Sequence, residues 1–317
     1  MSMNKIGHFY YIDHNNIQVE NNYLWYISLK RFMEADSFSL TECGSKYTNS
    51  YRLFLLHDEK PASFVHDVPL VCGNLYNMVV EVPRWTQAKM EISKNIPLNP
   101  IVQDIKKGKM RYVANVFPHH GYIWNYGALP QTWEDPNYKD PDTNCTGDND
   151  PIDACDIGSR RCASGEIIQV KVLGILAMID EGETDWKVIV INTDDPQASE
   201  INNIKDVEKH RPGLLRATVE WFKYYKVPDG KPVNKFAFNE EYKDREYAIK
   251  VIEHTHSQWK KLISGESHNE VFRTINQSIK DSENFTNDSL AVFRQQSTPL
   301  GEPGEIPPSV YHVSYVN

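Results

Sequence analysis

Short apolar runs, many of them β-branched, alternate with Gly, Pro and Asp turns over residues 51–191. This spacing predicts a closed or sandwich-like β core. Two of the runs, 174–179 and 186–191, flank Gly182 and predict a hairpin. Residues 79–85 predict a strand that ends near Pro83, and residues 108–113 predict another.

Helical periodicity follows the β-rich region. Pro212 marks the start of a helix over 214–227, in which Leu215, Val219 and Phe222 share one stripe.

A second helix is predicted with Asn239 as its N-cap and with Glu240 and Glu241 in its first turn. Its apolar face extends from Ala248 to Leu262 and includes Val251, Ile252, Thr255 and Trp259, and Gly265 ends the helix.

The ends of the chain differ from its middle. Residues 1–37 predict an N-terminal extension of unknown role, and residues 38–290 predict the main domain. Residues 291–317 are rich in Pro and Gly and predict a tail that wraps irregularly around the domain or is partly disordered.

Four aspartates crowd into residues 147–156, with no basic residue among them. Two like charges about 4 Å apart repel by roughly 4 kcal/mol at an effective dielectric of about 20. Asp148 and Asp150 point to the same side of an extended segment, and the bend at Pro151 brings Asp153 towards them. Such hard oxygen ligands suit Mg²⁺, Mn²⁺ or Ca²⁺ rather than zinc.

Two other readings of this run stay open at this point. One is a solvated acidic loop. The other is a calcium loop of the EF-hand type starting at Asp142, but Asp153 replaces the usual Glu, Pro151 interrupts the loop, and the flanks lack helical character.

A second group of charged residues has the alternation of strands. The predicted hairpin places Asp180 near Asp185, and Lys187 lies on the same face as Asp185. Lys89 shares a face with Glu91, and Lys109 shares one with Arg111. Each pair alone is typical of a solvent face. Together with the aspartates they indicate metal-assisted hydrolysis of a phosphoanhydride.

Charge and cysteine content limit the other possibilities. A net charge of −9 argues against a nucleic-acid or anionic-membrane binder. Five irregularly spaced cysteines indicate free thiols in a reducing compartment, so we expect a cytoplasmic protein. No apolar run approaches the length of a membrane span.

At this point the chain resembles a known family, the soluble family I inorganic pyrophosphatases of the eukaryotic type. The resemblance covers roughly residues 40–290, and it is carried in order by residues 80–85, 106–111, 117–122, 148–153, 180–187 and 212–218. It implies a mainly β fold with flanking helices, built on a five-stranded β-barrel of OB-like topology. It also implies Mg²⁺-dependent hydrolysis of pyrophosphate to two orthophosphates, with Mn²⁺ as a possible substitute.

The resemblance further implies a role for each matched residue. Asp150 would be the general base, and Tyr122 would support the pocket near it. The metal-binding residues would be Asp148, Asp153, Asp185, Asp180, Glu91 and Glu81, with several Mg²⁺ ions in each active site. The residues that grip the two phosphates would be Lys89, Arg111, Tyr126, Lys187, Tyr225 and Lys226.

Two expectations concern assembly. Arg84, Trp85 and His120 match positions of the family's dimer interface, so we expect a homodimer. The rival to the enzyme is a non-catalytic scaffold of the same fold that binds a partner, with residues 1–37 as a candidate binding segment. A scaffold has no need of the costly triple Asp148, Asp150 and Asp153, which favours the enzyme.

Overall fold

The computed structural model describes residues 38–316, so the predicted extension, residues 1–37, lies outside it. Its strands are β1 (Phe38–Cys43), β2 (Arg52–His57), β3 (Lys60–Ala62), β4 (Val71–Cys72), β5 (Leu75–Val82), β6 (Met90–Ile92), β7 (Ile101–Gln103), β8 (Ile105–Lys106), β9 (Lys109–Met110), β10 (Asn115–Val116), β11 (Asn125–Ala128), β12 (Thr146–Gly147), β13 (Asp153–Asp156), β14 (Ile167–Asp180), β15 (Glu183–Asn192), β16 (Lys235–Phe236), β17 (Lys243–Asp244) and β18 (Val313–Ser314). Its α-helices are α2 (Ile204–His210), α3 (Leu214–Tyr224), α4 (Arg245–Ile263) and α5 (Ser289–Gln296), and its 3₁₀ turns are η1 (Val227–Asp229), η2 (Phe238–Glu240) and η3 (Pro308–Tyr311).

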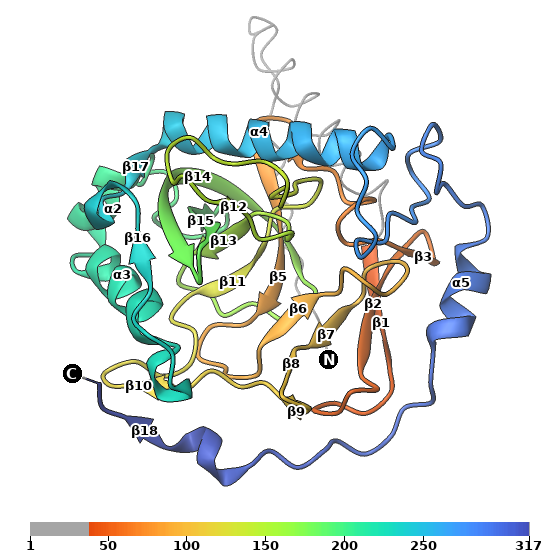
Figure 1. Ribbon diagram of the computed structural model, residues 1–317, viewed down its shortest axis with the longest axis horizontal. Helices are drawn as coiled ribbons and strands as arrows, with labels where there is room; N and C mark the ends of the chain where they lie inside the picture. The colour runs from red at the N-terminus through yellow and green to blue at the C-terminus, as the bar shows by residue number, and fades with distance from the viewer. Residues whose placement is uncertain (1–37, 317) are drawn as a thin grey trace, which may run out of the picture.

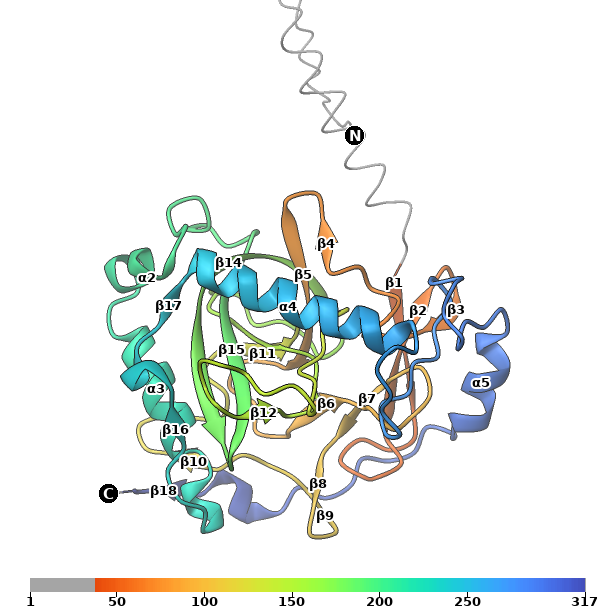
Figure 2. The ribbon, with the colours of Figure 1, turned by 45° about the horizontal axis from the view of Figure 1, so that its top comes forward.

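Five strands close on themselves at the centre of the molecule. Their order is β15, β13, β11, β5 and β14, and β14 pairs back with β15. Figures 1 and 2 show α4 lying across this ring, with α2 and α3 beside it. The prediction of a mainly β fold with a five-stranded core and outer helices is therefore confirmed.

The hairpin of β14 and β15 is the longest part of the ring. Its turn consists of Glu181 and Gly182, both with positive φ, which is the geometry that follows the twist of two antiparallel strands. Residues 172–178 of β14 and nearly all of β15 are buried, because the ring's interior lies on one face and helices cover the other. The hairpin predicted around Gly182 is confirmed.

A bulge in β11 adjusts the ring where it meets β5. The register shifts between Tyr126 and Gly127, and a Cβ at Gly127 would lie 1.9 Å from the carbonyl oxygen of Val79. Only glycine allows the two backbones to approach this closely. The bulge therefore fixes the place of Tyr126, which points into the cavity described below.

Both predicted helices exist with altered ends. The first ends at Tyr224 rather than at residue 227, and Val227 and Pro228 belong to the 3₁₀ turn η1. Asn239 was wrong as the cap of the second helix, because it has a positive φ of 56° and lies inside η2. The chain pairs with β14 as β17 before Asp244 caps α4 by accepting from the amide of Tyr247.

The apolar face predicted for α4 is largely correct. Ala248, Ile252, Thr255, Trp259 and Leu262 are buried, whereas Val251 is half-buried. The helix ends at Ile263, two residues before Gly265.

The strand predicted over 108–113 is wrong in length. Only Lys109–Met110 pairs, in a small hairpin with β8, and Tyr112 makes a single bridge to Ala88. The helices α2 and α5 were not predicted. None of the described helices combines the length and the apolarity that crossing a membrane requires.

A second sheet lies beside the ring, with strand order β1, β2, β7 and β6, and β3 pairs with β2. Beyond α5 the tail runs along the edge of the molecule, where β18 pairs with β10 and Gln87 donates to the carbonyl of Val310. The tail therefore wraps around the domain, which is one of the two alternatives that the sequence predicted for it. The boundaries at residues 38 and 291 stay predictions.

A buried histidine joins α4 to the second sheet's side of the core. Trp259 Nε1 donates to His66 Nδ1 at 2.9 Å, and His66 Nε2 donates to the carbonyl of Arg273 at 3.0 Å. His66 is fully buried. Burial lowers the pKa of this imidazole to about 4.

This pKa predicts a pH-dependent stability. Between pH 6.5 and about 4 the unfolded chain protonates His66 and the folded chain does not, so the free energy of unfolding falls as the pH drops, by about 3 kcal/mol in total. Gln can accept from Trp259 and donate to the carbonyl without titrating. Urea unfolding from pH 7 to pH 4 should therefore show a shallower decline for His66→Gln than for the wild type. Parallel declines would contradict the assignment.

Candidate active site

Every site residue predicted from the sequence lines one cavity of about 290 Å³. It opens at one end of the strand ring, between that ring, the second sheet and α3. The lining residues are Glu81, Lys89, Glu91, Ile92, Lys94, Asp104, Arg111, Tyr122, Tyr126, Ala128, Asp148, Asp150, Pro151, Asp153, Asp180, Glu183, Asp185, Lys187, Trp221, Phe222, Tyr225 and Lys226.

Strand pairing brings the central charges together. Asp153 opens β13, which runs parallel to β15 and places Asp153 opposite Lys187. Asp185 lies two residues before Lys187 on β15, so both face the same side. The ammonium of Lys187 contacts the carboxylates of Asp153 and Asp185, while the side chain of Lys187 is 2 % exposed. Burial disfavours this ammonium, but the two aspartates outweigh it and raise the pKa of Lys187.

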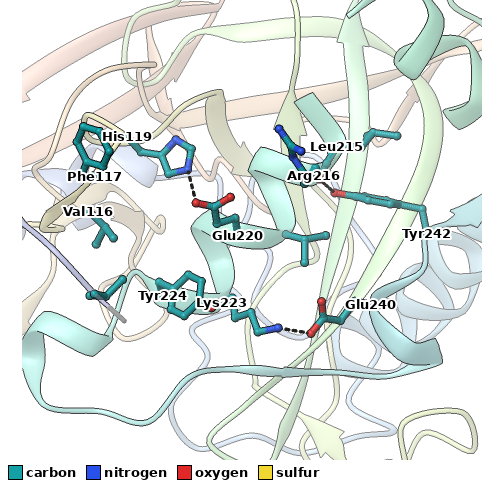
Figure 3. A pocket seen from close by; sticks show the side chains of 12 residues that line it. Val116, Phe117, His119, Leu215, Arg216, Glu220, Lys223, Tyr224, Glu240 and Tyr242 are labelled. Atoms are coloured by element: carbon teal, nitrogen blue, oxygen red, sulfur yellow. Dashed lines mark hydrogen bonds and ion pairs between the residues drawn. The ribbon is translucent and has the colours of Figure 1, made fainter. Parts of the chain in front are cut away.

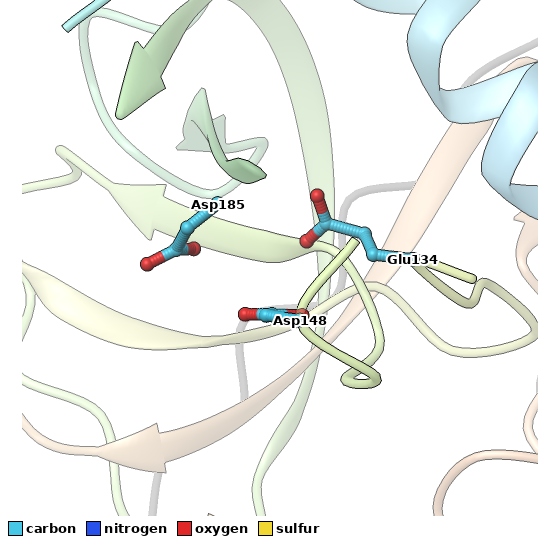
Figure 4. A group of neighbouring side chains, drawn as sticks. All are labelled: Glu134, Asp148 and Asp185. Atoms are coloured by element: carbon cyan, nitrogen blue, oxygen red, sulfur yellow. The ribbon is translucent and has the colours of Figure 1, made fainter. Parts of the chain in front are cut away.

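A further carboxylate completes the acidic centre. Oxygen atoms of Glu134, Asp148 and Asp185 lie within 4.8 Å of one another, and Figure 4 shows the three side chains grouped together. Burial, followed by the charge of Asp148, raises the pKa of Glu134 well above its usual range. Burial also raises the pKa of Asp185 to about 7.

Like Lys187, the other four basic groups of the cavity are each paired with an acid. Lys94 Nζ lies 2.8 Å from Asp150 Oδ1, and Arg111 Nη1 lies 2.8 Å from Asp104 Oδ2. Two further lysines also pair within the cavity, Lys89 with Glu91 and Lys226 with Asp180.

Three tyrosines stand among these charges. Tyr126 donates its hydroxyl to Asp153 and accepts from Lys187 Nζ at 3.0 Å. Tyr225 stacks on Trp221 with ring centroids 4.9 Å apart, so the end of α3 delivers it to the cavity. Burial raises the pKa of Tyr122 to about 12, so this phenol stays protonated near neutral pH.

The donor set fits divalent cations. Nine carboxylates and five basic groups line the cavity. Among the described residues, Asp148, Glu81 and Glu134 form no ion pair, and Glu134 Oε2 is buried without a hydrogen-bond partner. Burying unpaired carboxylates is costly. Hard cations with oxygen ligands would relieve that cost, and no His or Cys faces the cavity to favour zinc.

Sequence reasoning missed Glu134, Lys94 and Asp104. Glu134 lies in the irregular stretch between β11 and β12, and Lys94 follows the end of β6, so no periodicity marked their direction. Asp104 could have been predicted from one feature of the sequence, because it stands between two short strands near Arg111. The roles predicted for the other residues remain predictions.

A larger hollow, of about 580 Å³, lies on the other side of α3 (Figure 3). It is lined by α3, the loop at residues 116–119 and Val316, and it contains none of the predicted site residues. Its charged groups partly neutralise one another, because Lys223 forms an ion pair with Glu240 at 2.6 Å. It lacks the excess of acid that marks the cavity at the ring.

The cavity at the end of the closed β ring is lined by carboxylates, lysines and an arginine. This combination is typical of a class of protein, the enzymes that use cations to act on densely charged phosphate compounds. Comparison with known proteins narrows that class. The family model described as inorganic pyrophosphatase matches residues 78–260. The inorganic pyrophosphatase of Homo sapiens is 57 % identical over 247 residues, which are 77 % of this chain and 86 % of that one. That of Kluyveromyces lactis is 56 % identical over 73 % of this chain and 82 % of its own length.

Solved structures agree with the sequence relatives. The inorganic pyrophosphatase from Schistosoma japonicum matches with a TM-score of 0.83 and 50 % identity, covering 88 % of this chain and 100 % of that chain. That from Trypanosoma brucei brucei matches with a TM-score of 0.69 and 38 % identity, covering 78 % and 81 %. This chain belongs to the inorganic pyrophosphatase family.

The crowding of acids predicts the behaviour of Glu134→Gln. Gln can still accept from the amide of Trp186, as Glu134 Oε1 does at 3.2 Å, while one ionisable carboxyl group leaves the centre. With a chelator present, the variant should therefore melt about 2 °C or more above the wild type. Its gain in melting temperature on adding Mg²⁺ should be smaller. An unchanged gain would show that Glu134 does not contribute to a cation site.

Proposed function

We propose that this chain is an inorganic diphosphatase that hydrolyses pyrophosphate to two orthophosphates and depends on Mg²⁺. The observation that carries the proposal is that one cavity brings together ion-paired basic side chains and carboxylates that have no ion-pair partner. The family membership supports the reaction, and the scaffold alternative gains no support from relatives that are named as pyrophosphatases. Such an enzyme would draw pyrophosphate-releasing biosyntheses forward.

The carboxylates of the cavity would hold the cations. Asp148, Asp153 and Asp185 would hold the tightest one, with Glu134 beside them. Asp180 and Glu91 would hold ions that arrive with the substrate, and Glu81, which accepts from the amide of Ile92 at 2.6 Å, would orient their waters. Bound Mg²⁺ supplies positive charge against the phosphates and makes a coordinated water more acidic. Mn²⁺ has the same ligand preference and would substitute.

Asp150 is the proposed general base. Its side chain is 43 % exposed, which leaves an oxygen accessible to water, while Oδ1 contacts Lys94. Its amide donates to Asp148 Oδ1 at 2.9 Å, so the backbone connects it to the cation-binding aspartates. A carboxylate in this place can take a proton from the attacking water.

The basic groups and phenols would bind the substrate. Arg111 offers a planar fork that suits a phosphate, and Lys89, Lys187 and Lys226 act as point charges. Tyr126 and Tyr225 can donate hydrogen bonds to phosphate oxygens. Tyr122 lines the same cavity as Asp150 and would support the pocket near this general base.

Phosphate release tests the proposal directly. Release from pyrophosphate should rise as Mg²⁺ is titrated, and Asp150→Asn should reduce the maximal rate at least 100-fold because the water loses its base. Asp281→Asn is the matched control, since Asp281 is exposed and lies outside the cavity. A folded wild type that releases no phosphate with Mg²⁺ present would overturn the reaction. An active Asp150→Asn variant would overturn only the assignment of Asp150 as the general base.

We also propose a cytoplasmic homodimer. All five cysteines are free, which suits a reducing compartment. Trp85 is 56 % exposed and Phe117 is 60 % exposed, and Tyr315 of the tail stacks on Phe117 at 5.5 Å. Exposed aromatic groups of this kind are typical of protein interfaces.

The dimer predicts an effect of Trp85→Glu. Placing a charge in the apolar contact should shift the sedimentation of the protein from a dimer to a monomer of 36.6 kDa. Val271→Glu, which adds a charge at an exposed apolar residue elsewhere, should leave the dimer intact. A wild type that sediments as a monomer would contradict the dimer.

A further inference from the structure

The residues that follow α4 lie beyond the part of the sequence that the family model matches, and they pack beside the cavity. We call residues 264–276 the post-α4 segment. Its Phe272 is 3 % exposed and lies beside His66, with ring centroids 5.7 Å apart. The carbonyl of Arg273 accepts from His66 Nε2 and from Asn99 Nδ2, each at 3.0 Å. This part of the segment is therefore fixed to the core.

The segment reaches the residue before Asp150. Asn269 Nδ2 donates to Asn149 Oδ1 at 2.8 Å, and Trp133 Nε1 donates to the same oxygen at 2.9 Å. Asn149 stands between Asp148 and Asp150 with a φ of 69°. Asn adopts this left-handed region more readily than most residues, and contacts of its side chain can hold it there. The carboxamide of Asn149 is held by these two donors.

The same segment also reaches the partner of Asp150. The amide of Arg273 donates to the carbonyl of Lys94 at 2.7 Å, and Lys94 Nζ lies 2.8 Å from Asp150 Oδ1. Asn269 therefore holds the side chain of the residue before Asp150, and Arg273 holds the backbone of the lysine that contacts Asp150. The amide of Asn149 also donates to the carbonyl of Glu134 at 3.0 Å, and the amide of Glu134 donates to the carbonyl of Asp150 at 2.9 Å. Together these contacts set where the Asp150 carboxylate lies relative to the aspartates of the acidic centre.

We propose that Asn269 is a positioning residue for Asp150, acting through Asn149. This inference rests on the proposed function of Asp150 as general base. Asn269 does not line the cavity, so it touches neither substrate nor cation itself. Its effect is geometric, because misplacing a catalytic group by about 1 Å can cost up to 100-fold in rate.

The chemistry of Asn269 separates positioning from a purely structural role. Its Oδ1 accepts from the amides of Val271 and Phe272, at 3.0 Å and 2.9 Å, and so shapes the segment's own turn. Only its Nδ2 donates to Asn149. Asn269→Asp keeps the acceptor for the turn and removes the donor, whereas Asn269→Leu is uncharged and removes both.

The experiment measures kcat and KM for pyrophosphate at saturating Mg²⁺, with thermal melting alongside. Asn269→Asp and Asn269→Leu should both lower kcat by about tenfold, while KM changes less than twofold, because the substrate-binding groups stay in place. Asn269→Asp should melt near the wild type. Asn284→Ala is the control, since it removes a different hydrogen bond of the same segment, 2.8 Å to Thr274, which does not reach Asn149 or Lys94. It should leave kcat unchanged.

Each alternative outcome has one meaning. If Asn269→Asp keeps the wild-type kcat while Asn269→Leu loses rate and stability, the residue only shapes its turn and the inference is overturned. If KM rises and kcat does not fall, the segment acts on substrate binding and the inference is also overturned. If the wild type itself releases no phosphate, the proposed function fails first, which the control series makes visible.

Discussion

Mutual repulsion among carboxylates is the constraint on which the cavity's structure depends. Nine acids converge there against five basic groups, and each close pair of like charges costs roughly 4 kcal/mol at an effective dielectric of about 20. The structure meets part of this cost with ion pairs, of which the buried contact of Lys187 with Asp153 and Asp185 is the deepest. The remaining excess of negative charge is the basis of our proposal that the site binds divalent cations.

The strand ring makes such crowding possible because it is rigid. Parallel pairing of β13 with β15 sets Asp153 opposite Lys187, and the bulge at Gly127 sets Tyr126 against both. Contacts from distant segments then hold the loop that carries Asp148 and Asp150, including Asn269 through Asn149. A site built on strands and tied by outside segments keeps its charges in place before the substrate arrives.

How far the sequence predicts this site depends on where each residue lies. Asp185 with Lys187 and Lys89 with Glu91 could be placed because strands alternate their side chains, and the tight turn at Gly182 gave the hairpin. Glu134 and Lys94 could not, because they lie outside regular strands and only tertiary packing decides where they point. The same limit misplaced the start of α4, since the pairing of β17 with β14 takes precedence over a plausible cap at Asn239. Roles came from the family resemblance rather than from periodicity.

The central claim is that the excess acid of the cavity holds divalent cations. Anomalous scattering from a crystal of the protein grown with Mn²⁺ tests it most directly, because Mn²⁺ takes the same oxygen ligands as Mg²⁺ and its signal locates the ion. The account predicts a strong peak among Asp148, Asp153 and Asp185, with Lys187 moved away from at least one of the two aspartates that it contacts here. A cavity without a peak at millimolar Mn²⁺, with those contacts unchanged, would contradict it.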